Sequence, residues 1–326
     1  KLFNVLKDGY TSLYEDALHF HCENWARICL CSLWLSCLDS GEREKSQGIM
    51  PMIKFAAKDI LETEPNNCWA GLQLAIYYDR TLKHRKALAI VEKLLLGDPN
   101  SSPLLINRAN IMRTLGNIDG AIADYERCIE IDPKHVGAIY NLALIYRENK
   151  RQYQLSLDTL KRVLEVSPSF VLAIAECGNL ARQLQDYDAA LDYYKRALEL
   201  DDTMPDTYNG LGITYRNMGK FEESCEAYRN CLRIKPDFRH AYFNLGLLHQ
   251  SYNKPDEAMQ YFQNSLDLGP NYSNAWTMIG TLLSHTKPEE ALDYFDDALF
   301  LEPSLSNSRY KKITLINRLV RIRRRG

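Results

Sequence analysis

The sequence lacks a long, uninterrupted run of apolar residues. The longest apolar-rich stretch, 28–38, falls well short of the roughly 20 residues that a membrane-spanning helix needs. Lys7, Asp8 and Glu15 interrupt the N-terminal stretch, so we expect no signal peptide. The composition, 46% apolar and 25% charged, is that of an ordinary soluble protein. We therefore expect a cytoplasmic location, with the nucleus or a cilium as alternatives, and a first residue of Lys1 indicates an excised or processed fragment.

Sequence signatures of catalysis are also missing. There is no P-loop and no zinc-binding H-E-x-x-H motif. Gly210, Gly212 and Gly219 lack the spacing of a dinucleotide-binding loop, and the seven histidines are scattered. We expect a protein that is not an enzyme, with no cofactor and no small-molecule substrate.

The nine cysteines show no disulfide framework. Their number is odd and their spacing irregular, which favours small buried side chains in a reducing compartment. The alternative is a metal site made of Cys22, Cys29, Cys31 and Cys37. No paired C-x-x-C supports it, and we expect no bound metal.

What the sequence does contain is a proline about every 34 residues, after each of a series of helical segments. The successive spacings are 34, 34, 35, 34, 34, 34 and 33 residues, with Asp202 where one proline is due. A repeat of this length built from two helices is typical of a solenoid in which each unit contacts mainly its neighbours. The positions are Pro65, Pro99, Pro133, Pro168, Asp202, Pro236, Pro270 and Pro303.

The clearest unit is 205–238. Its first helix carries Tyr208, Leu211, Gly212 and Tyr215 on one face, and its second carries Ser224, Tyr228 and Cys231 on the inner face. Small residues recur at the Gly212 and Ser224 positions of seven units, and large ones at the Tyr228 position. This unit resembles the tetratricopeptide repeat (TPR) family.

The resemblance implies an all-α, right-handed superhelical solenoid of about eight TPR repeats with a C-terminal capping helix. We expect an N-terminal capping helix at 1–21 and a degenerate repeat at 22–67 with an inserted loop at 39–50. A basic capping helix and tail should occupy 306–326. Its Ile313, Ile316, Leu319 and Val320 would cover the open face of the last repeat. The seven full repeats are 68–101, 102–135, 136–170, 171–204, 205–238, 239–272 and 273–305.

In TPR arrays the first helices line a concave groove that commonly binds peptides or partner helices. Their second, fifth, sixth, ninth and twelfth positions point into it. Here the twelfth position is arginine in four consecutive repeats, which predicts a ladder of charges: Arg113, Arg147, Arg182 and Arg216. Amides and aromatic residues occupy other groove positions: Asn107, Asn110, Asn141, Asn179, Asn209, Asn244, Tyr140 and Phe243.

These residue types suit an extended or acidic peptide segment. Asparagine can donate to and accept from a peptide backbone, and arginine can hold a carboxylate with two hydrogen bonds. The alternative is that each arginine pairs with an acid of a neighbouring repeat, such as Glu148 or Glu176.

Two patterns known in the family fit only in part. Asn110 and Asn141 match asparagines of the carboxylate clamp of chaperone adaptors, but Leu172 and Glu176 stand where that clamp needs a lysine and an arginine. Asn107, Asn141 and Asn244 resemble the asparagine ladder of the O-linked N-acetylglucosamine transferase array.

We therefore expect a protein-interaction scaffold or adaptor that binds a protein or peptide ligand in its groove. The alternatives are a structural subunit of a large complex, such as ciliary, cell-cycle or trafficking machinery, and the TPR targeting region of a larger enzyme such as a glycosyltransferase. The last 21 residues carry eight basic side chains and no acid, whereas the other 305 have a net charge of −10. Within this tail, the cluster Arg321, Arg323, Arg324 and Arg325 could contact an acidic partner or a membrane.

Overall fold

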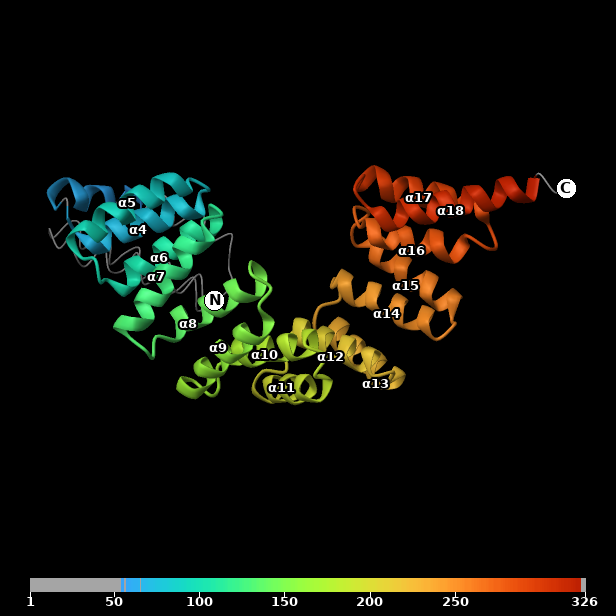
Figure 1. Ribbon diagram of the computed structural model, residues 1–326, viewed down its shortest axis with the longest axis horizontal. Coiled ribbons are helices and arrows are strands. Elements are labelled where there is room, and N and C mark those ends of the chain that lie inside the picture. The colour runs from blue at the N-terminus through green and yellow to red at the C-terminus, as the bar shows by residue number, and fades with distance from the viewer. Residues whose placement is uncertain (1–53, 56, 65, 324–326) are drawn as a thin grey trace, which may run out of the picture. The chain divides into compact units, whose positions relative to one another are not determined.

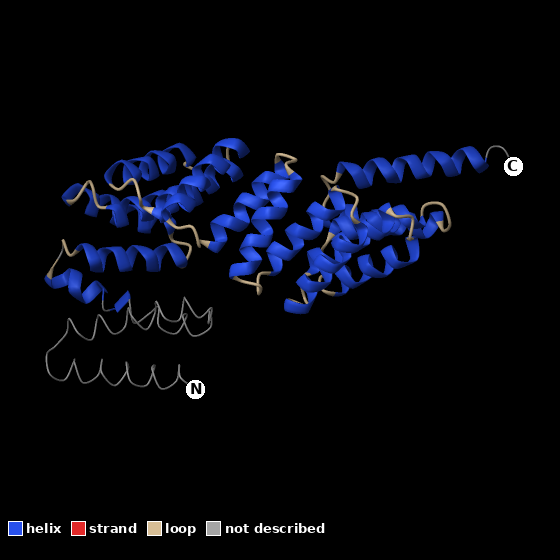
Figure 2. Ribbon diagram, turned by 90° about the horizontal axis from the view of Figure 1, so that it is seen from below, coloured by secondary structure: helices blue, strands red, loops and turns tan. Residues whose placement is uncertain are grey.

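The computed structural model describes residues 54–323 apart from 56 and 65, and all regular secondary structure in this part of the chain is helical (Figure 2). The all-α repeat architecture predicted from the sequence is confirmed. The expected helix at 1–21, the loop at 39–50 and most of the degenerate repeat 22–67 lie outside the described residues.

The helices, which are labelled in Figure 1, fall into two compact units. Unit 1 runs to Gln152 and unit 2 begins at Tyr153. In unit 1, a helical segment ending at residue 63 is followed by α4 (Cys68–Arg80), α5 (His84–Gly97), α6 (Ser102–Thr114), α7 (Ile118–Ile131) and α8 (Val136–Glu148). Unit 2 contains α9 (Tyr153–Val166), α10 (Val171–Gln183), α11 (Tyr187–Leu200), α12 (Pro205–Asn217), α13 (Phe221–Ile234), α14 (Arg239–Ser251), α15 (Pro255–Asp267), α16 (Ser273–Leu283), α17 (Pro288–Leu301) and α18 (Ser306–Arg323).

Within each unit, consecutive helices pack as antiparallel pairs. In unit 1 these are α4 with α5 and α6 with α7, and in unit 2 they are α10–α11, α12–α13, α14–α15 and α16–α17. The first helices of successive pairs also touch, as α10, α12 and α14 do. Most second helices end two residues before the recurring proline, for instance at Ile131 before Pro133 and Ile234 before Pro236. Proline cannot continue a helix, so it directs the chain into the next pair.

Small residues let the paired helices approach closely. A Cβ added at Gly212 would lie 2.6 Å from a ring carbon of Tyr228, which is fully buried. The Ser224 hydroxyl donates to the Gly212 carbonyl over 2.8 Å, so the polar atom in this contact is satisfied. The repeating small and large residues seen in the sequence are thus complementary halves of one packing contact.

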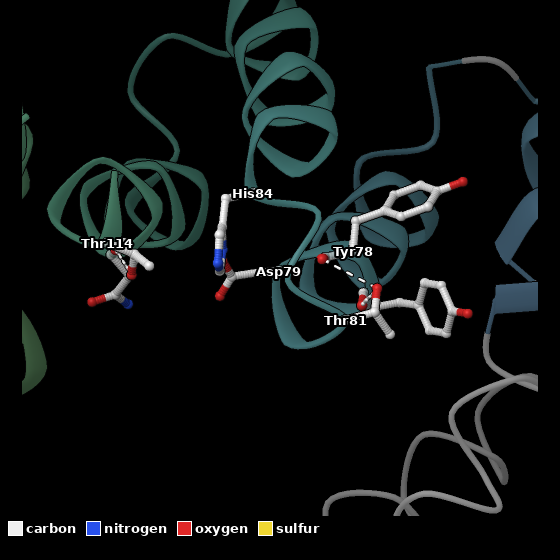
Figure 3. A network of polar contacts seen from close by, with 7 residues as sticks. Tyr78, Asp79, Thr81, His84 and Thr114 are labelled. Carbon is white, nitrogen blue, oxygen red and sulfur yellow. Dashed lines mark hydrogen bonds and ion pairs between the residues drawn. The ribbon is translucent and has the colours of Figure 1, made fainter. Parts of the chain in front are cut away.

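Five of the six helix pairs turn through a residue with positive φ, and a sixth such residue, Arg151, lies between the ends of α8 and α9. These residues stand 34 or 35 positions apart and are Leu82, Gly116, Arg151, Gln185, Gly219 and Asn253. A left-handed residue after the first helix allows the chain to reverse while the last carbonyls keep hydrogen-bond partners. At the first such turn, the Thr81 hydroxyl donates to the carbonyls of Tyr77 and Tyr78 over 2.9 and 3.2 Å. Figure 3 shows the contact with Tyr78 and, beside it, His84, whose Nδ1 lies 2.7 Å from Asp79.

These turns predict opposite effects for two substitutions. Gly219→Ala is expected to lower the free energy of unfolding by about 1 kcal/mol, because a side chain is strained at positive φ. Gln185→Gly relieves that strain at the equivalent exposed turn and should raise stability by up to about 1 kcal/mol. Urea unfolding of both variants checks this, and two changes of the same sign would contradict it.

Helix α18 packs on the last pair through only one of the four apolar residues expected, Leu319. Leu315, which was not predicted, is its buried neighbour in this contact, whereas Ile313, Ile316 and Val320 are exposed. The correction is one of helix register, because each residue of a helix is rotated by about 100° from the last, so Leu315 faces the last pair while Ile313, two positions earlier, faces away. Side chains beyond Arg321 lie outside the described residues.

His249 occupies the large-residue position of the first helix of its repeat and is buried between Phe221 and Tyr261. Neither of its ring nitrogens has a hydrogen-bond partner in the described part of the chain. Burial lowers the pKa of His249 below its usual value, and the nearby Lys254 acts in the same direction.

The protein should lose stability through His249 as the solution is acidified. Its pKa is lower in the folded state, so the unfolded chain binds a proton that the folded chain rejects once the pH falls below about 6.5. His249→Phe keeps an aromatic ring at this position but removes the imidazole that binds this proton in the unfolded chain. Thermal unfolding of both proteins from about pH 8 to about pH 5 should show a steeper loss for the wild type. Parallel curves would refute the assignment.

Candidate first-helix binding faces

The twelve predicted site residues all lie on first helices and are half-buried, six in each unit. We call the surface that they form in each unit its first-helix face. In unit 1 the residues are Asn107, Asn110, Arg113, Tyr140, Asn141 and Arg147. In unit 2 they are Asn179, Arg182, Asn209, Arg216, Phe243 and Asn244. A single ladder of four arginines running through both units remains a prediction.

In unit 1 the two arginines converge on one carboxylate. Arg147 Nη2 donates to Glu148 Oε1 over 2.6 Å, and Arg113 Nη1 lies 3.6 Å from Glu148 Oε2. The alternative considered from the sequence, pairing with a neighbouring acid, thus applies to this half of the arginine series. Both guanidinium groups have part of their charge compensated before any ligand arrives.

Buried tyrosines orient two of the asparagines. The Tyr125 hydroxyl donates to Asn110 Oδ1 over 2.5 Å, and the Tyr194 hydroxyl donates to Asn179 Oδ1 over 2.8 Å. Burial raises the pKa of Tyr125 to about 12, so this hydroxyl keeps its proton and remains a donor. With its oxygen occupied, each amide presents its NH₂ group for other contacts.

Further along unit 2, two asparagines from successive repeats bond to each other. Asn244 Nδ2 donates to Asn209 Oδ1 over 2.9 Å. The pair leaves the Asn209 NH₂ group and the Asn244 oxygen for other partners, one donor and one acceptor. Beside it, Phe243 packs edge-on against Tyr272 with ring centres 5.0 Å apart.

The unit 2 arginines differ from those of unit 1, because no carboxylate pairs with either among the described residues. Arg182 Nε donates to the Tyr194 hydroxyl over 3.4 Å. Arg216 has a buried Nη1 with no partner, and the fully buried Tyr228 hydroxyl beside it also has none. In this repeat, Ile213 stands where Asn110 and Asn179 meet the equivalent tyrosines. Arg216 Nη1 and the Tyr228 hydroxyl are therefore two buried hydrogen-bond donors without an acceptor.

Matches to known proteins agree with this architecture. Family models described as "TPR repeat" match residues 109–150 and 178–219, and models described as "Tetratricopeptide repeat" match 205–238 and 240–272. The chain belongs to the tetratricopeptide repeat family. Repeats of this family form protein–protein interaction scaffolds, and the fold is generally non-catalytic.

Solved structures share the fold of this TPR protein at low sequence identity. The Cut9–Hcn1 hetero-tetramer of the APC/C matches with a TM-score of 0.61 and 17% identity over 82% of this chain and 52% of that one. PilW, a type IV pilus biogenesis factor, matches with a TM-score of 0.58 and 19% identity over 65% of this chain and 96% of that one.

A curated human protein, Protein O-mannosyl-transferase TMTC3, is 39% identical over 82 residues. This stretch is 25% of the TPR protein but only 9% of the human protein.

One polar pair in this TPR protein escaped the sequence interpretation. Arg108 Nε and Nη2 donate to the two carboxylate oxygens of Asp124 over 2.7 and 2.6 Å, and Asp124 is buried. The hydrogen bond to Asp124 raises the pKa of Arg108. In the repeat 205–238 the same two positions hold Leu211 and Ala227, so the pair is an addition to the common core. Comparing these two positions between repeats could have revealed the Arg108–Asp124 pair from the sequence alone.

In the described part of the chain, no group of three or more His, Cys, Asp or Glu side chains is placed to hold a metal ion. Cys128, Cys177, Cys225 and Cys231 are buried free thiols, and Cys68 is exposed. The alternative metal site at Cys22, Cys29, Cys31 and Cys37 lies outside the described residues. None of the helices described is both long enough and apolar enough to cross a membrane.

Proposed function

We propose that this TPR protein is a non-enzymatic scaffold that binds an extended, acidic segment of a partner protein on the first-helix face of unit 2. One observation carries the proposal: Arg182 and Arg216 have no acidic partner among the described residues, and Arg216 Nη1 and the Tyr228 hydroxyl are buried donors without an acceptor. A carboxylate or backbone carbonyl of a ligand would supply the missing acceptor.

The neighbouring amides add backbone recognition to charge recognition. The donor and the acceptor that the half-buried Asn209–Asn244 pair leaves over match the alternating carbonyl and amide groups of an extended peptide. Phe243 and Tyr272 offer an aromatic surface to a side chain of that peptide. The unit 1 face, where Glu148 already engages both arginines, would bind acidic segments less strongly.

The experiment is affinity capture from cell extract with quantitative mass spectrometry. Wild type is compared with Arg182→Glu/Arg216→Glu and with Arg229→Glu/Arg233→Glu. The second pair carries the same charge change on exposed positions of α13, a second helix. Partners with acidic segments should be lost from the first variant and kept by the second. Equal capture by all three proteins would refute the proposal.

A second candidate function is suggested by the similarity to the O-mannosyl-transferase TMTC3, in which this chain would be the TPR region of a larger transferase. The coding sequence of the whole gene tests this directly. A transferase domain in the same reading frame would support it, and an open reading frame confined to TPR repeats would rule it out.

Two finer features belong to the same proposal. The buried free thiols suit a reducing compartment such as the cytoplasm. The tail, of which Arg321 is the last residue with a described side chain, would attract an acidic partner or an anionic membrane. Deleting residues 321–326 should then weaken such contacts without changing binding at the unit 2 face.

A further inference from the structure

A cavity of about 340 Å³ lies between α16, α17 and α18 in unit 2. Phe295 and Leu315, both almost fully buried, form its apolar wall. Thr281 from α16, together with Lys311 and Arg318 from α18, adds polar groups. This volume is at the lower end of the range for small-molecule sites, roughly 300–1,000 Å³.

Lys311 points into this cavity without an acidic partner. Its Nζ donates to the Thr281 hydroxyl over 2.9 Å, and no described carboxylate lies within ion-pair distance of it. Burial lowers the pKa of Lys311, which reflects the cost of holding an ammonium group in apolar surroundings. A bound anion would remove that cost.

Arg318 stands two helical turns further along the same face of α18. It donates to the Ser284 carbonyl, and its Nη1 donates to His285 Nδ1 over 2.9 Å. Its Nε is buried and has no partner in the described part of the chain. Neither the Ser284 carbonyl nor the His285 ring carries a negative charge, so the guanidinium charge of Arg318 is uncompensated.

By contrast, the charge of the adjacent Lys312 is compensated, because Lys312 forms an ion pair with Asp296. No aspartate or glutamate lines the cavity. The cavity therefore combines an apolar wall, two unpaired cations and one buried donor without an acceptor.

We propose that this cavity binds a small carboxylic acid with an apolar body. Its carboxylate would be held by Lys311 and Arg318, and its hydrocarbon part would lie against Phe295 and Leu315. The exposed Tyr310 and Thr314 stand at the mouth. This ligand site is separate from the proposed peptide-binding face and does not depend on it.

Isothermal titration calorimetry with octanoate tests the proposal, with 1-octanol and octylammonium as probes of equal length. Octanoate alone should bind saturably. Lys311→Met, which keeps the length of the side chain, should weaken its binding about tenfold or more, because a hydrogen bond to a charged group is lost. Lys312→Met is the matched control and should bind octanoate like the wild type.

A second variant keeps both charges and blocks the cavity. Thr314→Trp changes an exposed position whose hydroxyl bonds only to the Tyr310 carbonyl, so the helix should persist. It should abolish octanoate binding while the circular dichroism spectrum is unchanged.

Four results would overturn the assignment. Two concern the wild type: no saturable binding of octanoate up to roughly 10 mM, or octanol binding as tight as octanoate binding. Two concern the variants: octanoate binding weakened equally by Lys311→Met and Lys312→Met, or octanoate binding unchanged in a folded Thr314→Trp protein. A peptide with a free C-terminal leucine that binds more tightly than octanoate would instead assign the cavity to the end of a polypeptide.

Discussion

Replacing Asp124 by alanine is expected to lower the free energy of unfolding by about 2–3 kcal/mol, a large single-residue effect for a side chain that touches no ligand. The substitution removes both acceptors of Arg108 and leaves a guanidinium group packed in the second repeat. About a quarter of the Arg108 side chain remains exposed, at 26%, so water recovers part of the cost.

Another repeat of the same chain suggests a double variant that should restore the lost stability. Arg108→Leu combined with Asp124→Ala installs the residues that the repeat 205–238 carries at these positions, Leu211 and Ala227. The double variant should come within about 1 kcal/mol of wild type, since an apolar pair can replace a buried ion pair. Urea unfolding of the two single variants and the double variant completes the cycle. A double variant as unstable as Asp124→Ala would contradict this account.

The second large effect concerns binding. Arg182→Glu/Arg216→Glu should weaken the binding of an acidic partner segment at least a hundredfold, because two charge-assisted hydrogen bonds are replaced by repulsion. Wild-type affinity should also fall with added salt, and the variant should lose that dependence. Fluorescence anisotropy with a labelled segment from a captured partner measures both.

Controls separate this effect from unfolding. Arg182 and Arg216 are half-buried at the surface of their helices, and helicity should be retained in the double variant. The exposed pair Arg229→Glu/Arg233→Glu should bind within about twofold of wild type, because it alters net charge equally at a distance from the face. Equal losses in both variants would indicate a general charge effect and no site.

The helix pairs were predictable from the sequence because one residue position on each helix determines how the two helices pack. Gly212 and Tyr228 recur as small and large residues every 34 positions, and each repeat forms its contact locally. The turns were predictable only where glycine marks them. Leu82, Arg151 and Gln185 adopt the same positive φ without a glycine, because the helices on both sides fix the turn.

The sequence predicted which positions carry the candidate site residues, but it did not decide which of the arginines pair with an acid. Arg113 and Arg182 occupy equivalent places, yet one lies near Glu148 and the other bonds to a buried tyrosine. The outcome depends on one acid in the following repeat, Glu148, which the sequence offered only as an alternative partner. The unmet donors of Arg216 and Tyr228 arise because Ile213 replaces an asparagine, and only the side-chain geometry reveals this.

The most direct test of the central claim is a charge-swap measurement between Arg216 and the partner segment. Each acidic residue of a captured segment is changed in turn to lysine, and its affinity is measured against wild type and Arg216→Glu. We predict one lysine position that wild type binds weakly and Arg216→Glu binds at least tenfold better. If the effects of the two changes simply add at every position, Arg216 does not contact the partner and the proposed binding face is wrong.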